Sequence, residues 1–254
     1  MEIYLQWKEM IKAGMELPFW QEFYVKFYQA FIENNRWLQY LKGVGNTLLV
    51  TALALVIGVI LGVLVAVIRT AYDQKRPGTR KPLLGIANGI CKVYVTVIRG
   101  TPMLVQLLIM GFVIFSTSRR YTAVGILTLG INSGAYVAEI IRGGLMSLDP
   151  GQAEAGRSLG LSYTDTMRFI VIPQAFKAIL PSLGNEFITL LKDTALIYTI
   201  GGEELLYAAK AISTRTYEQM FPLVGTALVY LALVLIFTWL QGILERRLRQ
   251  SDRR

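Results

Sequence analysis

The chain has 254 residues, of which 54% are hydrophobic and 17% are charged, and its mean hydropathy of +0.46 argues against an ordinary soluble globule. It holds no histidine and one cysteine, Cys91, so His-based acid–base chemistry, a His-ligated metal and an intrachain disulfide are excluded. The net charge of +9 fits either a nucleic-acid-binding face or the cytoplasmic side of a membrane protein, and the composition favours the membrane protein.

The first predicted element is a helix near the N-terminus with many aromatic residues. Between positions 19 and 32 the apolar residues recur at helical spacing, and Glu22 and Lys26 stand i,i+4. Residues 1–42 lack the apolar core of a signal peptide. The pattern predicts an amphipathic helix in the membrane interface, with a helix packed on the protein's own spans as the equal alternative.

Five apolar segments predict an all-α integral membrane protein with about five transmembrane helices. Two of them are uncharged runs that exceed the roughly 18 residues marking a span, and two shorter runs follow the same logic. The remaining segment is interrupted by Glu186, Lys192 and Asp193. In chain order the five segments are 43–68, 100–118, 121–138, about 179–202 and 219–244.

The distribution of Lys and Arg predicts the orientation. Fourteen of them follow the first span, follow the third span or lie in the C-terminal tail, against four in the two opposite loops. Because cytoplasmic loops carry the excess of cations, we expect the C-terminus inside and the N-terminus outside. Membrane topology then accounts for most of the net charge of +9, so no nucleic-acid partner is required to explain it. The 14 residues are Arg69, Lys75, Arg76, Arg80, Lys81, Arg142, Arg157, Arg168, Lys177, Arg246, Arg247, Arg249, Arg253 and Arg254.

The longest loop expected on the cytoplasmic side has the pattern of two short helices. Asp149 followed by Pro150 is typical of an N-cap and a first helical position, and Gly160 suits a left-handed helix stop. Ser162 and Asp165 are spaced like a second cap, close to a capping box. We expect two small helices, joined at a glycine corner, that protrude and dock into a partner. A plain surface loop is the alternative.

This loop resembles the EAA loop of ABC-importer permeases, and the resemblance rests on segments 151–156, 159–162 and 172–175. Segments 94–106, 135–144 and 191–196 resemble the polar amino acid (histidine/glutamine-type) permeases. Together these motifs cover about residues 45–250 in the family's order. One departure is Gly156, which stands where the second alanine of the EAA group is usual and is expected to loosen the helix slightly.

The resemblance implies the fold of a type I ABC importer permease with a cytoplasmic coupling helix. It implies a second permease subunit, identical or closely related, two ATPase subunits that bind ATP and magnesium, and an extracellular or periplasmic amino-acid-binding protein at a prokaryotic inner membrane. The chain has no P-loop motif, so we expect no catalytic residue, metal or cofactor in it. The residues expected to couple to the ATPase are Glu154, Ala155, Gly156, Leu159 and Gly160.

These features divide the chain into three parts. Residues 1–42 form the N-terminal amphipathic segment, and residues 43–245 form the transmembrane permease domain, with the coupling loop at 147–175. Residues 246–254 form a basic cytoplasmic tail. The N-terminal segment is longer than the short start that is common in the family, so its role stays open.

Charged and polar residues within the spans are candidates for the substrate path. A charge at membrane depth costs roughly 2.5–3.5 kcal/mol, so it usually faces a pore or a partner. Arg99 precedes Gly-Thr-Pro, where Pro102 removes a backbone N–H and disturbs the helix. An amino acid needs a cation for its carboxylate and a carboxylate for its ammonium group. The alternative is that the charges pair with one another. The candidates are Arg99, Thr101, Gln106, Glu139, Lys192 and Asp193.

The sequence therefore predicts an ABC importer permease for a polar or charged amino acid. A secondary, ion-coupled transporter would need an internal repeat, and the two halves of the sequence show no convincing one. An intramembrane enzyme without histidine would need a Ser/Lys or Asp/Asp arrangement, for which there is no motif. A membrane scaffold would not need a broken helix or deep charges.

Overall fold

The computed structural model describes residues 2–73 and 81–251, with side chains up to Leu248. Every regular element in these ranges is helical, which confirms the predicted all-α class. The α-helices are α1 (Glu2–Lys12), α2 (Phe19–Phe31), α3 (Arg36–Asp73), α4 (Pro82–Gly100), α5 (Met103–Ile109), α6 (Tyr121–Met146), α7 (Pro150–Ser158), α8 (Tyr163–Thr166), α9 (Ile172–Asp193), α10 (Leu205–Thr216) and α11 (Met220–Ser251). Short 3₁₀ or π-helical segments are η1 (Glu33–Asn35), η2 (Met110–Ile114), η3 (Met167–Val171) and η4 (Thr194–Ile200).

Four stretches of the described chain are long and apolar enough to cross a membrane. Three of them include α3, α6 and α11, which contain the uncharged runs expected there, apart from Gln219. The helix α3 has 38 residues, which at 1.5 Å per residue is about 57 Å, almost twice the hydrocarbon thickness of a bilayer. It must therefore tilt or extend beyond the membrane.

The second predicted span, 100–118, is wrong in its bounds. The fourth span-length stretch is α4, Pro82–Gly100, whereas the expected segment forms only the short apolar helix Met103–Ile114. The chain breaks between them because Thr101 and Pro102 are extended, and Pro102 has no N–H to continue the helix. Lys92 and Arg99 lie within α4, so a search for uncharged runs passes over it.

The interrupted fifth segment is also helical, with shifted bounds. It begins at Ile172 rather than near Ile179, and α9 ends at Asp193. The following residues form the 3₁₀ segment η4 and a turn at Gly201, which has a φ of +86°. Because α9 contains charged residues, its hydropathy is too low to mark it as a membrane span. It nevertheless packs against α6, α3 and α11 and completes the bundle.

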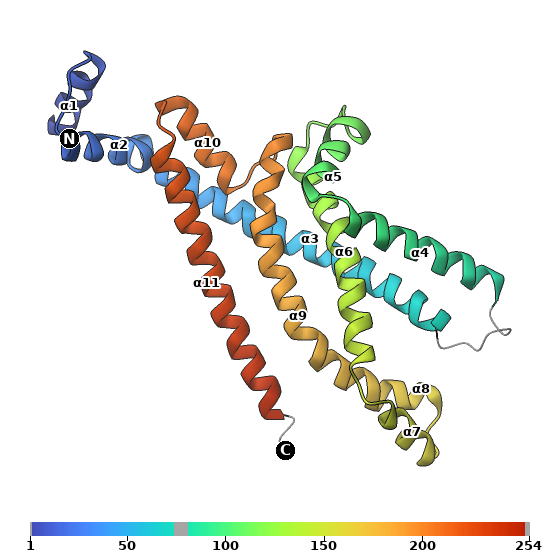
Figure 1. Cartoon of the computed structure of the whole chain (residues 1–254). Helices are drawn as coiled ribbons and strands as arrows, with labels where there is room; N and C mark the ends of the chain where they lie inside the picture. Colours follow the sequence, from blue (N-terminus) through green and yellow to red (C-terminus); the bar gives the residue numbers. More distant parts are fainter. Residues whose placement is uncertain (1, 74–80, 252–254) are drawn as a thin grey trace.

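The helices place the two ends of the chain far apart. In Figure 1, α6, α9 and α11 run lengthwise through the bundle in alternating directions, and α3 crosses behind them. The small helices α7 and α8 lie at the same end as the C-terminal part of α11, whereas α1, α2 and α10 lie at the other end (Figure 1). Of the cations expected on one side, Lys75, Arg76, Arg80, Arg253 and Arg254 lie outside the described residues.

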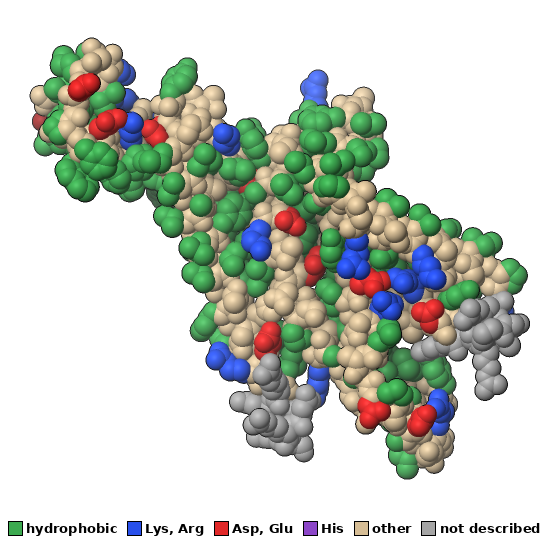
Figure 2. Space-filling view, viewed as in Figure 1, with side chains coloured by type: hydrophobic (Ala, Val, Ile, Leu, Met, Phe, Trp, Pro, Cys, Tyr) green, Lys and Arg blue, Asp and Glu red, His purple; other side chains and the backbone are tan. Residues whose placement is uncertain are grey.

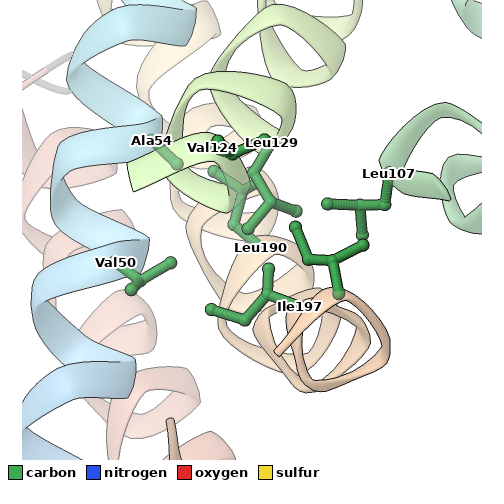
Figure 3. Close-up of a cluster of buried hydrophobic side chains, with 8 residues drawn as sticks. Val50, Ala54, Leu107, Val124, Leu129, Leu190 and Ile197 are labelled. Carbon is green, nitrogen blue, oxygen red and sulfur yellow. The ribbon is translucent and has the colours of Figure 1, made fainter. Parts of the chain in front are cut away.

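The main core joins helices that are distant in sequence. It combines side chains of α3, α5, α6, α9 and η4, most of which are fully enclosed. Figure 3 shows these side chains converging between the helices. The cluster consists of Val50, Ala54, Leu107, Val124, Leu129, Leu190, Ile197 and Ile200. Burying each such side chain contributes about 1.5–3 kcal/mol in water, whereas within a bilayer close packing matters more.

The most extensive helix contact, α3 against α6, depends on a G-x-x-x-G pair. A Cβ at Gly62 would lie 2.5 Å from Val137 Cγ1, and one at Gly58 would lie 2.7 Å from Ser133 Oγ. Small residues at this spacing let two helix backbones approach closely. The second pair of the sequence, Gly85 and Gly89, makes no such contact, because the nearest atom to a Cβ at Gly85 is 3.8 Å away.

The N-terminal segment packs on the spans, as one of the two expected alternatives has it. Val25 and Ala30 are buried, and Phe23 packs on Phe221 of α11 with ring centroids 4.9 Å apart, so α2 contacts the spans. Phe19 and Trp20 on the aromatic face of α2 are 68% and 75% exposed, and their placement in a membrane interface stays a prediction. The predicted pair of Glu22 and Lys26 forms an ion pair of 2.7 Å.

Candidate functional site: a coupling knob and a broken helix

The helix α7 starts as the sequence predicted. Asp149 is its N-cap, and the Asp149 Oδ1 atom accepts a hydrogen bond of 2.8 Å from the backbone N–H of Gly151. Pro150 takes the first helical position, where its missing N–H costs nothing. These two residues fix the point at which the chain leaves α6 and turns into the loop.

A glycine corner then separates α7 from α8. Gly160 has a φ of +77°, a left-handed conformation that favours glycine. Ser162 caps α8 by accepting a hydrogen bond of 3.1 Å from the backbone N–H of Asp165 and by donating one of 2.6 Å to its carboxylate. The two helices form a knob that projects from one end of the bundle (Figure 1), which we call the coupling knob, residues 149–166.

Four of the five predicted coupling residues are exposed, and the fifth, Gly156, is buried. Glu154, Ala155, Leu159 and Gly160 are exposed, and Leu159 is 80% accessible. Gly156 is buried, and a Cβ there would lie 2.8 Å from Thr166 Cγ2. The glycine therefore allows α7 to approach α8, a tight-packing role that the expectation of a looser helix did not include.

The break between α4 and α5 is held by a side chain. Gln106 Nε2 donates to the carbonyl oxygen of Ile98 at 2.8 Å and to the hydroxyl of Thr101 at 2.8 Å. The Gln106 Oε1 atom accepts a hydrogen bond of 3.0 Å from Asn132 of α6. The amide thus satisfies a helix end that the extended Thr101–Pro102 pair leaves without backbone partners. Sequence reasoning missed Asn132, which carries no charge and lies in an apolar run.

Glu139 on α6 is surrounded by three guanidinium groups. It forms ion pairs with Arg69 of α3 and with Arg142, the latter at 2.9 Å. Arg99 of α4 lies 3.9 Å from its carboxylate and 5.1 Å above the ring of Tyr136. The structure therefore brings together the predicted path residues Arg99 and Glu139. It adds Arg69, which the sequence analysis had used only to predict the membrane orientation. This cluster supports the pairing alternative for Glu139.

Lys192 and Asp193 lie elsewhere, at the end of α9. Among the described residues, neither side chain makes a hydrogen bond or an ion pair. Lys192 is exposed and Asp193 is half-buried. The next residue, Thr194, is fully buried and its hydroxyl donates to the carbonyl oxygen of Leu191 at 2.8 Å. Of the predicted path residues, these two charges are the ones without a hydrogen bond or ion pair to another described helix.

Two carboxylates, the half-buried Glu186 and the buried Glu204, had no predicted role. Ser133 of α6 donates a hydrogen bond of 2.7 Å to Glu186 of α9. Glu204, which is 1% exposed, caps α10 by accepting hydrogen bonds of 2.6 Å from two backbone N–H groups, and it accepts one of 2.7 Å from the Tyr230 hydroxyl. Burial raises the pKa of the Glu204 carboxyl above its usual value. Only the interruption of an apolar run by Glu186 hinted at either site.

Known proteins resemble this chain in both sequence and structure. The chain is 36% identical over 217 residues to the arginine transport system permease protein ArtQ of Bacillus subtilis, covering 84% of this chain and 93% of that protein. It is 35% identical over 214 residues to the glutamine transport system permease protein GlnP of Escherichia coli, covering 82% and 92%.

Two solved structures also resemble this chain. An amino acid ABC transporter solved with histidines matches with a TM-score of 0.74 and 40% identity, over 82% of this chain and 94% of that chain. The inward-facing MetNI methionine ABC transporter shares the fold, with a TM-score of 0.71 at 18% identity, over 85% and 99%. Residues 83–250 match the model of one family. The chain therefore belongs to the family of binding-protein-dependent transport system inner membrane components.

Proposed function

We propose that this chain is the membrane-spanning subunit of an ABC importer that carries a polar or charged amino acid into the cell. ATP hydrolysis in a partner ATPase, which binds the nucleotide and magnesium, drives the transport. The two relatives described above are permeases for arginine and glutamine, which supports this substrate class. The single observation that carries the proposal is the coupling knob, a rigid, capped projection on a chain that has no P-loop of its own.

The coupling knob is suited to transmit motion. Its exposed residues Glu154, Ala155 and Leu159 would enter a cleft of the ATPase, while buried Gly156 keeps α7 against α8. Gln174 of α9 donates a hydrogen bond of 3.0 Å to Gln152 of α7. Movement of the knob would therefore pull on α9, and α9 carries the charges proposed for the substrate path.

The proposed substrate path runs past the α4–α5 break and the end of α9. Arg99, Thr101 and Gln106 lie at the break, where residues 100–102 are exposed. Because exposed polar backbone is tolerated in a membrane only where it lines a water-filled cavity, the break would line the path. Lys192 and Asp193 are neighbours of opposite charge that make no ion pair with another described helix, so they would hold the carboxylate and the ammonium group of an amino acid. Glu139 would hold helices together through its guanidinium partners.

The assembly that we propose contains two permease subunits, two ATPase subunits and an amino-acid-binding protein on the outer side. The coupling knob would face the cytoplasm of a prokaryotic cell, with the C-terminus inside and the N-terminus outside. This orientation follows the excess of cations at the knob end. The helices α1 and α2 would then lie at the outer surface of the membrane.

Reconstitution tests the proposal. The chain is incorporated into vesicles with its ATPase and its binding protein, and amino-acid-stimulated ATP hydrolysis is measured together with uptake. Glu154→Lys should abolish stimulated uptake while membrane insertion stays normal. The matched control is Glu16→Lys, which reverses an exposed carboxylate at the opposite end of the molecule. Uptake without an ATPase would instead indicate a secondary transporter, and normal transport by Glu154→Lys would remove the coupling assignment.

A further inference from the structure

A cationic cavity opens beside the Glu139 cluster. It has a volume of about 330 Å³ and lies between α3, α4 and α6. Figure 2 shows Lys and Arg side chains gathered over this part of the molecule, beside α4. The cavity is lined by Arg69, Lys92, Val95, Thr96, Arg99 and Glu139. Three cations thus face one carboxylate, so the cavity keeps a positive charge.

Among the described residues, Glu139 is the one carboxylate in the cavity lining, and it is already engaged. Glu139 accepts hydrogen bonds from Arg69 and from Arg142, the latter at 2.9 Å. Another carboxylate of the region, Asp73, interacts electrostatically with Arg142. Several donors therefore stay unused. Within the described chain, the ammonium group of Lys92 has no hydrogen bond or ion pair, and Arg69 Nε is buried without a partner. Such donors favour an anion with several acceptor oxygens.

The cavity lies toward the end of the bundle that bears the coupling knob. Glu139 stands seven residues before the end of α6, which is about 10 Å along the helix axis from that end. Arg69 stands four residues before the end of α3. Basic pockets between transmembrane helices are suited to anionic headgroups.

An apolar strip on α4 runs next to the cations. Its side chains are 52–77% exposed and recur at helical spacing, whereas Lys92, Thr96 and Arg99 share the adjacent face. The strip consists of Leu83, Ile86, Ile90, Val93 and Val97. A small soluble anion would make no contact with this apolar surface, whereas a phospholipid would pack its acyl chains on it and place its phosphate in the cavity.

We propose that the part of the cavity formed by Arg69 and Lys92 binds the phosphate group of an anionic phospholipid from the leaflet on the coupling-knob side. The proposal rests on the proposed function only for calling that leaflet cytoplasmic. The bound lipid would supply the acceptor that the Lys92 ammonium group lacks, and would tie α3 to α4.

Lipid retention measures this site without any transport. The complete transporter is placed in nanodiscs of phosphatidylcholine with phosphatidylglycerol, and the lipid that it keeps after detergent exchange is quantified by native mass spectrometry. Lys92→Gln should retain about fivefold less phosphatidylglycerol, which corresponds to the ~1 kcal/mol that one Lys contributes near an anionic surface. Lys92→Arg should retain the wild-type amount. The matched control is Lys81→Gln, an exposed cation next to α4 that lies outside the cavity.

Competition experiments separate the possible anions. Inorganic phosphate, arginine and glutamine are added at millimolar concentration, and none should release the retained lipid. Equal retention by Lys92→Gln and Lys81→Gln overturns the proposal. So does release by inorganic phosphate, which would indicate a free-anion site, or release by an amino acid, which would extend the substrate path from Arg99 to Lys92. Because no ATP or transport enters the measurement, its failure leaves the proposed function untouched.

Discussion

Ser133 of α6 donates a hydrogen bond of 2.7 Å to the carboxylate of Glu186 on α9, and this bond joins two helices inside the bundle. Ser133 is fully buried, and a Cβ at Gly58 of α3 would lie 2.7 Å from its hydroxyl oxygen. Three helices thus meet around one hydroxyl group. A carboxylate at this depth needs such a donor, because hydrocarbon offers none.

Loss of this donor should destabilise the protein. Ser133→Ala leaves the Glu186 carboxylate with an unsatisfied oxygen, which costs about 1–3 kcal/mol in a buried site. We expect a lower midpoint of thermal unfolding in detergent. Ser182→Ala, an exposed serine on α9, serves as the control and should unfold at the wild-type temperature. Identical midpoints for the two variants would show that the Ser133–Glu186 bond contributes nothing.

Two glycine pairs of identical spacing should respond with opposite signs. Gly62→Ala forces a Cβ to within 2.5 Å of Val137 Cγ1, and such overpacking costs typically about 1–3 kcal/mol. Gly89→Ala meets no atom within 4 Å, and the higher helix propensity of alanine should stabilise α4 by up to about 1 kcal/mol. Thermal unfolding of both variants checks this, and stabilisation by Gly62→Ala would be the contrary result.

Within the coupling knob, Gly156→Ala should reduce transport by displacing α7 from α8. The new Cβ would lie 2.8 Å from Thr166 Cγ2 and 2.9 Å from Thr166 Oγ1. We expect weaker stimulation of ATP hydrolysis by the amino acid, with normal membrane insertion. The double variant Gly156→Ala/Thr166→Ala removes the clash and should recover most of the stimulation. Without that recovery, the contact with Thr166 is not the cause.

The buried carboxyl of Glu204 should make stability depend on pH. Its pKa is raised by burial, so the folded protein binds this proton more tightly than the unfolded chain does. Its contribution is therefore fully present below the ordinary Glu pKa of 4.5 and is lost as the pH rises through the raised value. Glu204→Gln removes this group from the titration. Unfolding midpoints measured from pH 4 to pH 8 should consequently fall less steeply for the variant, and parallel curves would contradict the assignment.

Local patterns were sufficient to predict several elements. The caps at Asp149 and Ser162 and the left-handed Gly160 depend on residues within one or two turns, and each lies where its spacing indicated. The uncharged runs in α3 and α11 likewise needed only their length and composition. Such features are visible in sequence because the interactions that form them are short-range.

Charges within helices misled the search for spans. Lys92 and Arg99 hid α4, and the extended Thr101–Pro102 pair confined the following apolar run to a short helix. In the folded protein Arg99 lies 3.9 Å from Glu139, a partner 40 residues away in sequence. A hydropathy scale counts the full free-energy cost of placing each charge in lipid, because it does not include neutralisation by a side chain that is distant in sequence.

Composition, run lengths and capping patterns were enough to predict a helical membrane protein with a capped projection, and the motifs indicated the permease family. The side-chain pairs became visible only in the folded chain: Glu139 with three arginines, Gln106 with Asn132, and Ser133 with Glu186. The tertiary structure also shows that Gly62 is a packing position while Gly89 is not. The physical reason is that helix formation follows from neighbouring residues, whereas pairing and close approach depend on how separate helices are placed in space.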